Sequence, residues 1–552
     1  MKNSILFIFC TLFIGLSSLA QEKKTINILH SDFTDRNENE IPGAVIFTGN
    51  VQVEHDGVLI SCNKAYHFKN ENYVKAFGNV RLNQGDTITM SSKYAEYNGN
   101  QQFAFATGDV VLRSPESTLT TDTINFDRSI QQAYYNTHGT IINKENTLRS
   151  KSGRYFLNEK KYQFKTAVTV TSPESTIKTN HLDYYEDSGH AYVFGPSTIN
   201  NKGNIIYTEN GFYDTKNQTS NLSKNSTITY QNRKIKGEKI YYDGKRNFSS
   251  ATNNVKITDS INRMVVTGHY AEMHRAKDSM FITKKALIAS FVENDSVYIH
   301  AEKLLVTGKQ GERIVRGFKN ARIFKSDMSG KCDSIHSDQT KGLTQLIGRP
   351  ILWSQKSQLT GDLMHLIGNN QTEKLDSLKV MNNAFIIQKD TIGNGFNQVK
   401  GMNLYGKFRD NKLYEVDMVK NAEMIYYMYN DKNELVGIDK GVCSSIHLEL
   451  EENQIQTVTK FTNPEGQIYP EKEFPENARK LRGFIWRGDE EIKRLEDIFS
   501  KEELALDEKA QMQSKKNAVE AEKPMEVKKE TLEYGKSEKK TAPAPVKKKK
   551  KK

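Results

Sequence analysis

The chain has 552 residues, more than one hydrophobic core usually serves, so it holds several domains or an array of repeats. Only 36% of the residues are hydrophobic and the mean hydropathy is −0.67, but 10% aromatic residues and many Val, Ile and Thr residues exclude a wholly disordered chain. The net charge of +12 is diluted over the chain, and six of the positive charges form the run 547–552.

The N-terminus has the features of a signal peptide. Lys2 precedes an apolar run over residues 5–16, and Ser18-Leu19-Ala20 has the small-x-small pattern of a cleavage site. We expect cleavage after Ala20, so residues 1–20 are a signal peptide and the mature protein is exported. No later stretch approaches the roughly 20 apolar residues of a membrane-spanning helix. Export also argues against a nucleic-acid partner.

Three cysteines follow the signal peptide: Cys62, Cys332 and Cys443. They are far apart and no C-x-x-C pair occurs, so the sequence supports neither a disulfide framework nor a zinc site. We expect them to be small buried residues.

A Gly-polar-Val pattern recurs along the first part of the chain. It occurs at Gly49, Gly78, Gly108 and Gly139, in steps of about thirty residues, and later copies lose the glycine but keep the period. A fixed period of this length is typical of repeats that bury their apolar faces against one another.

A second pattern alternates with the first. It reads apolar, x, small or polar, x, x, apolar or small, x, bulky, and its copies begin at Ile60, Met90, Leu119, Leu148, Ile177, Ile206, Ile235, Val266 and Ile299. Side chains on a strand alternate faces, so a step of three requires a bulge or bend in mid-strand. Gly78 would allow a similar bend in the preceding strand. The sequence therefore predicts an all-β fold, an elongated antiparallel jelly roll of two facing sheets, built from hairpins that repeat every ~29 residues.

The predicted interior contains many small side chains, such as Ala76 and Ala95, which fill a sandwich poorly. Regular inward Ile and Val residues are ordinarily only core, but a poorly filled interior favours a groove for an apolar ligand. The positions that we expect to line it are Ile60, Val80, Met90, Val110, Leu119, Ile177, Ile206 and Ile235.

These patterns, together with the segment Val45–Val53, resemble the OstA/LptA family of lipopolysaccharide-transport proteins. The resemblance covers residues 25–310 well and fades over 311–470, an irregular continuation. It implies a V-shaped β-jelly roll in the periplasm whose interior holds lipid acyl chains, at work in outer-membrane assembly. The implied partners are lipopolysaccharide or a related glycolipid, other transport components joined by edge-strand pairing, and further copies stacked end to end.

The C-terminal part changes character. Residues 475–510 are predicted to be helical, with Ile492, Leu495 and Ile498 on one side and a capping box at Ser500 and Glu503. This helical segment could cover the last sheet edge. Residues 511–552 form a Lys-rich tail that we expect to be disordered.

Catalytic motifs are missing from the sequence, which contains no H-E-x-x-H, G-x-S-x-G or P-loop. His336, His365 and His447 are isolated. We therefore expect no enzyme activity, no cofactor and no metal site. Two alternatives stay open: a β-solenoid that binds or cleaves polysaccharide, which requires parallel strands, and a structural envelope scaffold.

Overall fold

The computed structural model describes residues 26–509 and Met512, apart from short gaps at positions 56, 86–87, 116, 144–145, 174, 186, 202–203, 215, 293–294, 310, 370–371, 373, 411 and 452–453. The expected signal peptide and nearly all of the Lys-rich tail lie outside these residues. The chain divides into two units, Met1–Leu504 and Ala505–Lys552. Among the helices in the described part, none combines the length and apolar character that crossing a membrane requires.

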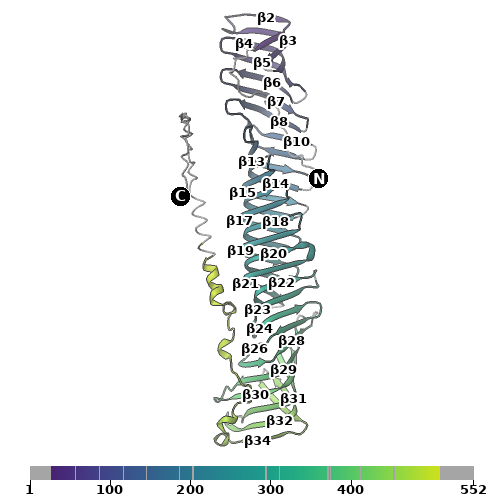
Figure 1. The fold of residues 1–552 in the computed structure, drawn as a ribbon, viewed down its shortest axis with the longest axis vertical. Helices are drawn as coiled ribbons and strands as arrows, with labels where there is room; N and C mark the ends of the chain where they lie inside the picture. The colour runs from purple at the N-terminus through teal and green to yellow at the C-terminus, as the bar shows by residue number, and fades with distance from the viewer. Residues whose placement is uncertain are drawn as a thin grey trace, which may run out of the picture. The chain divides into compact units, whose positions relative to one another are not determined.

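Strands make up most of the first unit (Figure 1). In chain order they are β1 (Asn27–His30), β2 (Phe33–Asp35), β3 (Val45–His55), β4 (Val58–Phe68), β5 (Tyr73–Gln84), β6 (Ile88–Asn98), β7 (Phe103–Arg113), β8 (Ser117–Asp127), β9 (Gln132–Tyr135), β10 (Gly139–Asn143), β11 (Thr147–Ser150), β12 (Ser152–Phe156), β13 (Lys161–Thr171), β14 (Ser175–Tyr185), β15 (His190–Asn201), β16 (Asn204–Asp214), β17 (Thr219–Tyr230), β18 (Arg233–Asp243), β19 (Phe248–Asp259), β20 (Met264–His274), β21 (Ser279–Val292), β22 (Asp295–Thr307), β23 (Ile314–Lys325), β24 (Met328–Asp338), β25 (Leu343–Ile347), β26 (Ile351–Ser354), β27 (Ser357–Thr360), β28 (Leu363–Gly368), β29 (Leu375–Lys389), β30 (Phe396–Arg409), β31 (Lys412–Tyr429), β32 (Leu435–Glu451), β33 (Gln454–Phe461) and β34 (Glu465–Tyr469). The 3-10 turns are η1 (Arg275–Lys277), η2 (Glu471–Glu473), η3 (Glu476–Ala478), η4 (Gly488–Glu490) and η5 (Leu495–Ile498).

Successive strands of the sheet pair with one another in antiparallel fashion, so each hairpin stacks on the one before it. The succession runs from purple β3 to green β32 in Figure 1. Antiparallel pairing confirms the predicted hairpins and shows that the parallel β-solenoid alternative is wrong.

Most of the long strands bend in the middle. In alternate strands two consecutive residues at the bend have positive φ, as at Gly78 (φ 70°) and Asn79 (φ 48°), and the register with the next strand shifts between Phe77 and Val80. Later bends use pairs without glycine, such as Asn253 and Asn254. Asparagine tolerates the left-handed region better than most residues, which lets the period survive the loss of glycine. The predicted bend at Gly78 is confirmed.

The small or polar position of the second pattern has a defined role at these bends. Its side chain donates a hydrogen bond to the carbonyl two residues on, as from Ser92 Oγ to Tyr94 O (3.1 Å) and from Thr208 Oγ1 to Asn210 O (2.8 Å). Cys62, Cys332 and Cys443 hold this same position and make the same contact through Sγ. All three are free and buried, as predicted, and burial raises the pKa of Cys332 to about 12.

Gly139 is an exception to the predicted pattern. The positive φ lies one residue earlier, at His138 (61°), and Gly139 is the first residue of β10. A Cβ atom at Gly139 would lie 2.3 Å from the Tyr135 ring, so its missing side chain makes room for that ring. Gly139 pairs with Thr121, as Val110 does, so Gly139 occupies the position of the valine in the pattern and not that of the glycine.

One inward row of side chains, the aliphatic ladder, runs through directly paired residues from β3 to β23. Its members are Val53, Ile60, Leu82, Met90, Leu112, Leu119, Ile141, Leu148, Val170, Ile177, Ile199, Ile206, Ile228, Ile235, Ile257, Val266, Ile288, Ile299 and Ile323. On the other side of each bend a second inward row faces it, so the folded sheet encloses its own core.

Residues 470–504, here called the strap, lie on the outer face of the second half of the sheet. Phe474 and Leu481 are buried against Phe385, Ile425 and other outward residues of β29–β32. Farther along, Arg322 Nη1 on β23 donates to Ile498 O (2.6 Å), and Glu503 lies 3.2 Å from His300 on β22.

The helix that we expected over 475–510 is much shorter, covering 501–509, while 475–499 is irregular with turns η3–η5. The capping box is confirmed: Ser500 N donates to Glu503 Oε2 (2.9 Å) and Glu503 N to Ser500 Oγ (3.2 Å). Ile492 and Ile498 are buried, but against the sheet face rather than over its last edge.

Candidate functional site

A largely apolar cavity of about 150 Å³ lies inside the N-terminal part of the folded sheet. Strands β3–β9 supply nearly all of its lining. The cavity exists because inward positions on the two sides of the bends carry side chains of different sizes.

One wall of the cavity is built from small side chains. Ala76, Ala95 and Ala106 are directly paired across β5–β7, and Ala104 and Ala133 follow on the neighbouring row. Methyl groups cannot reach the opposite wall, so the space between the walls is left unfilled.

The opposite wall is the first part of the aliphatic ladder. Ile60, Leu82, Met90 and Leu112 are paired in sequence across β4–β7 and line the cavity. A flexible Met side chain adapts to ligands of irregular shape. This wall offers a continuous hydrocarbon surface that runs across the strands.

The two edges of the folded sheet meet beside this cavity. The His55 ring, at the end of β3, lies 5.3 Å from the Tyr97 ring, near the opposite end of β6. His67 lies on the same inward row as Tyr97, and burial lowers its pKa, with Lys69 adding to the effect. The neutral form of His67 is therefore favoured where the interior is apolar.

The structure places the eight predicted groove residues in three environments. Ile60 and Met90 line the cavity. Ile177 and Ile206 are partly exposed inside the sheet, where the buried core is interrupted between Val193 and Leu222. The other predicted residues are packed in the core: Val80, Val110, Leu119 and Ile235. Contact of any of these with a lipid stays a prediction.

The aliphatic ladder is closely packed in the middle of the sheet, where a cavity of about 260 Å³ lies between Ile257, Met264 and the charged edge residues. Ladder residues from Ile228 to Ile323 are at most 7% exposed. The edges are also tied together there: Arg275 packs over Tyr230 at 4.8 Å, and Arg313 Nη2 lies 4.0 Å from Asp259 Oδ2. These contacts join opposite edges of the sheet, because Asp259 ends β19 while Arg313 precedes the other end of β23. An apolar cavity with a polar rim, about 230 Å³, reappears near the last strands, around Leu359 and Leu378.

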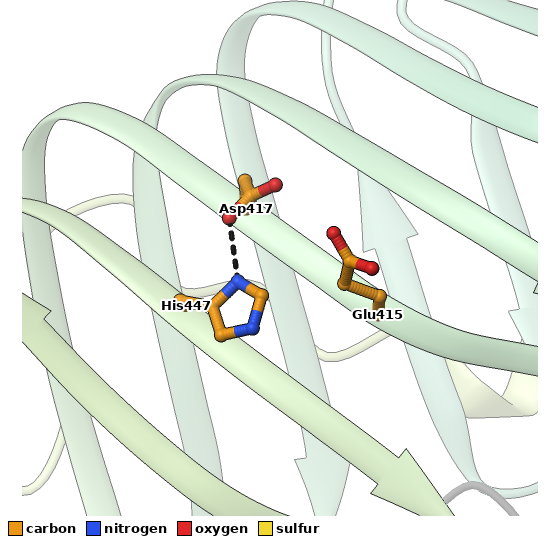
Figure 2. A group of neighbouring side chains, drawn as sticks. All are labelled: Glu415, Asp417 and His447. Carbon is orange, nitrogen blue, oxygen red and sulfur yellow. Dashed lines mark hydrogen bonds and ion pairs between the residues drawn. The ribbon is translucent and has the colours of Figure 1, made fainter.

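Glu415, Asp417 and His447 form a surface cluster on β31 and β32 (Figure 2). The His447 Nδ1 and Asp417 Oδ1 atoms are 2.7 Å apart, while Glu415 accepts a hydrogen bond from Lys407 Nζ at 2.7 Å. The Lys407 ammonium already supplies positive charge to the cluster. His447 is thus a hydrogen-bond partner of Asp417, and His365 is hydrogen-bonded to Gln345.

Comparison with known protein families gives a match in the N-terminal part of the chain. Residues 23–180 match the family described as OstA-like protein. This region is therefore similar to OstA-like proteins and is called the OstA-like region below. It contains the apolar cavity and its two walls, but covers less than a third of the chain.

A solved protein structure also matches part of this chain. The crystal structure of LptH, "the LptA homologous periplasmic component of the conserved lipopolysaccharide transport device from Pseudomonas aeruginosa", is 17% identical and covers 26% of this chain and 94% of its own, with a TM-score of 0.15. Among curated proteins, none matches the chain.

Several residues that line the cavity were not among the groove residues predicted from the sequence. Leu82 and Leu112 belong to the same ladder as Met90, and their alternation within each strand was the available signal. His55 and Tyr97 at the rim had no such signal, because they come together only when the sheet folds.

Proposed function

We propose that this chain is a periplasmic envelope protein that holds the acyl chains of lipopolysaccharide or a related glycolipid in its N-terminal cavity, and that it serves outer-membrane assembly without being an enzyme. The observation that carries the proposal is the cavity between the alanine wall and the aliphatic ladder of the OstA-like region. The ligand class comes from the resemblance of the repeats to the OstA/LptA family, and the location from the expected signal peptide.

The chemistry of the cavity supports an acyl chain over a polar ligand. Apolar pockets bind by removing hydrocarbon surface from water, worth about 25 cal/mol per Å². The lining between the two walls offers almost no polar group to bond a sugar or a phosphate. The head group of a bound glycolipid would therefore stay outside, at the meeting edges near His55 and Tyr97.

A photo-crosslinking residue at Met90 tests this proposal. Labelled lipopolysaccharide should crosslink at Met90, which faces inward, and not at the adjacent exposed Thr89. Val266, inward but fully buried in the filled core, is a second control that should stay unlabelled. Equal labelling at Met90 and Thr89 would contradict the proposal. Filling the cavity with Ala106→Phe should reduce labelling at Met90 without abolishing folding.

Pairing of edge strands with other components, or with further copies, is also part of the proposal. The sheet ends at β1 and β2, which pair only with β3, and at β33 and β34, which pair only with β32. Phe33 and Ile468 at these two ends are 73% and 59% exposed. Open edges with exposed apolar residues favour strand addition.

A structural scaffold is the second candidate for the later part of the chain. The ladder residues of β18–β23 are packed in the core, the cavity of about 260 Å³ beside them has a largely polar and charged rim, and the strap holds the outer face of β22–β32. Crosslinking confined to the N-terminal cavity, with none near Leu359, would assign a purely structural role to this part.

A further inference from the structure

The outer surface of the second half carries a cleft of about 770 Å³ between the strap and the bends of β28–β31. Residues 482–487 of the strap form one side, and the bend residues Asn382, Asn383 and Asn421 form the other. This cleft lies on the opposite face of the sheet from the apolar interior, because Phe385, Ile387 and the strap make up a separate outer cluster.

Positive charge predominates in the cleft. Arg349, Lys400, Arg482 and Arg487 line it, against two carboxylates, Asp362 and Glu423. Lys400 Nζ is 3.0 Å from Glu423 Oε1, and Arg487 forms a two-pronged pair with Glu490. The carboxylate of Asp362 accepts a hydrogen bond from Asn383 at 3.0 Å. The acidic groups are thus engaged within the protein.

Two guanidinium groups remain available in the cleft. Within the described chain, the side chains of Arg349 and Arg482 have no hydrogen bond or ion pair, and both residues are exposed. Arg349 is the second residue of a bend pair, with φ of 50°. Other bends carry an asparagine at this position that donates to a carboxylate on the facing strand, as Asn225 does to Glu209 at 2.9 Å. An arginine in this conformation costs stability, and at this bend no local bond offsets that cost.

The geometry points to a binding site for an anionic saccharide, with the acidic group on Arg349 and Arg482 and the sugar hydroxyls on the asparagine amides. Guanidinium groups bind carboxylate and phosphate in a two-pronged manner. The size of the cleft falls in the range for small-molecule ligands and far exceeds what one phosphate ion needs. The site does not depend on acyl-chain binding in the N-terminal cavity.

Calorimetric titration of the full mature chain tests this inference. Glucose 6-phosphate or glucuronic acid should bind, and glucose should not. The preferred acid tells whether the saccharide is phosphorylated or carboxylated. Arg349→Ala with Arg482→Ala should weaken binding at least tenfold. Arg349→Lys should weaken it partially, because lysine keeps the positive charge but cannot form the two-pronged hydrogen bonds of a guanidinium group. Arg81→Ala, which removes an exposed arginine of β5, is the matched control and should have no effect.

Two results would overturn the inference. The first is unchanged affinity in the double variant, with a melting temperature equal to that of the parent chain. The second is inorganic phosphate binding as tightly as glucose 6-phosphate, which would assign an ion site without sugar recognition. Crosslinking of lipopolysaccharide at Met90 in the same double variant should be unchanged, so failure here is distinguishable from failure of the proposed function.

Discussion

Gln358 on β27 and Gln398 on β30 hold the strap with the same pair of hydrogen bonds. Gln358 Nε2 donates to Ile485 O (2.7 Å) and its Oε1 accepts from Arg487 N (2.7 Å). Gln398 Nε2 donates to Arg479 O (2.8 Å) and its Oε1 accepts from Leu481 N (2.8 Å). Both glutamines are 0% exposed. Each side-chain amide therefore acts toward the strap as the backbone of a neighbouring strand would.

Replacing Gln398 by Leu should detach the middle of the strap. The change leaves Arg479 O and Leu481 N buried without partners, at a cost of about 1–3 kcal/mol for each group. Hydrogen exchange at the Leu481 amide should accelerate by at least tenfold, and proteolysis should cut the strap. Gln467→Leu, at an exposed position in β34, is the control and should change neither. Unaltered exchange at Leu481 would contradict this account of the strap.

Gly78→Ala should destabilise the bend of β5 by about 1–2 kcal/mol, since a left-handed residue acquires a Cβ atom. That atom would also lie 2.9 Å from Asn63 Nδ2. Gly57 is a suitable control, because it has a similar φ of 77° but open space around its Cβ position. The loss at Gly57 should be smaller, as measured by urea unfolding. Equal losses would mean that the contact with Asn63 is irrelevant.

Asp259→Asn should strongly destabilise the protein, although Asp259 lies at the end of a strand, at the edge of the sheet. Asp259 is 2% exposed and accepts from Arg233 Nε at 3.1 Å, with Arg313 nearby and 8% exposed. Removing the charge of Asp259 leaves Arg313 buried without its counter-charge, a situation that costs about 3–5 kcal/mol. Asp327→Asn, which breaks a surface pair with Lys325, should cost less than about 1 kcal/mol. Thermal unfolding of the two variants distinguishes these values.

His67 should make the N-terminal region less stable in acid. Its pKa is lowered on folding, so the unfolded chain binds the proton more tightly than the folded chain does. His67 does not lower the free energy of unfolding above about pH 6.5, the ordinary pKa of histidine. Below that pH the free energy of unfolding decreases, until the pH reaches the lowered pKa of His67 in the folded state. Exchange rates of amides in β4 and β5, followed from pH 7.5 to 5 and corrected for intrinsic exchange, should show this loss. In His67→Gln the loss should be smaller; an identical pH profile would rule His67 out.

The hairpin architecture could be predicted from sequence because its signals are local. Side-chain alternation and the step of three between Cys62 and Ala65 can each be recognised within a single strand. The bends form where those steps occur. The bend at His138 was missed because the glycine in this copy of the pattern comes one residue later, at the start of β10.

The cavity was only partly predictable. Ala76 and Ala95 signalled a thin wall, but Ile177 and Ile257 occupy equivalent ladder positions and only the second is buried. Their difference in burial depends on how closely the two inward rows approach each other, and no local sequence pattern predicts that distance. The strap was missed for a similar reason: Gln398 and Leu481 are far apart in the chain, and the helical periodicity of 475–499 gave no sign that its backbone bonds to glutamine side chains.

The strap also changes how the molecule should unfold under mechanical force. In a stack of hairpins each strand is held by its two neighbours, so tension applied to an end should peel the hairpins away one at a time. The strap reaches from β32 back to β22. A hairpin between these strands therefore cannot detach from the sheet until the strap has detached from the hairpins that precede it in the direction of pulling. The first half should therefore extend in small successive steps, whereas the second half should resist and then give way as one block.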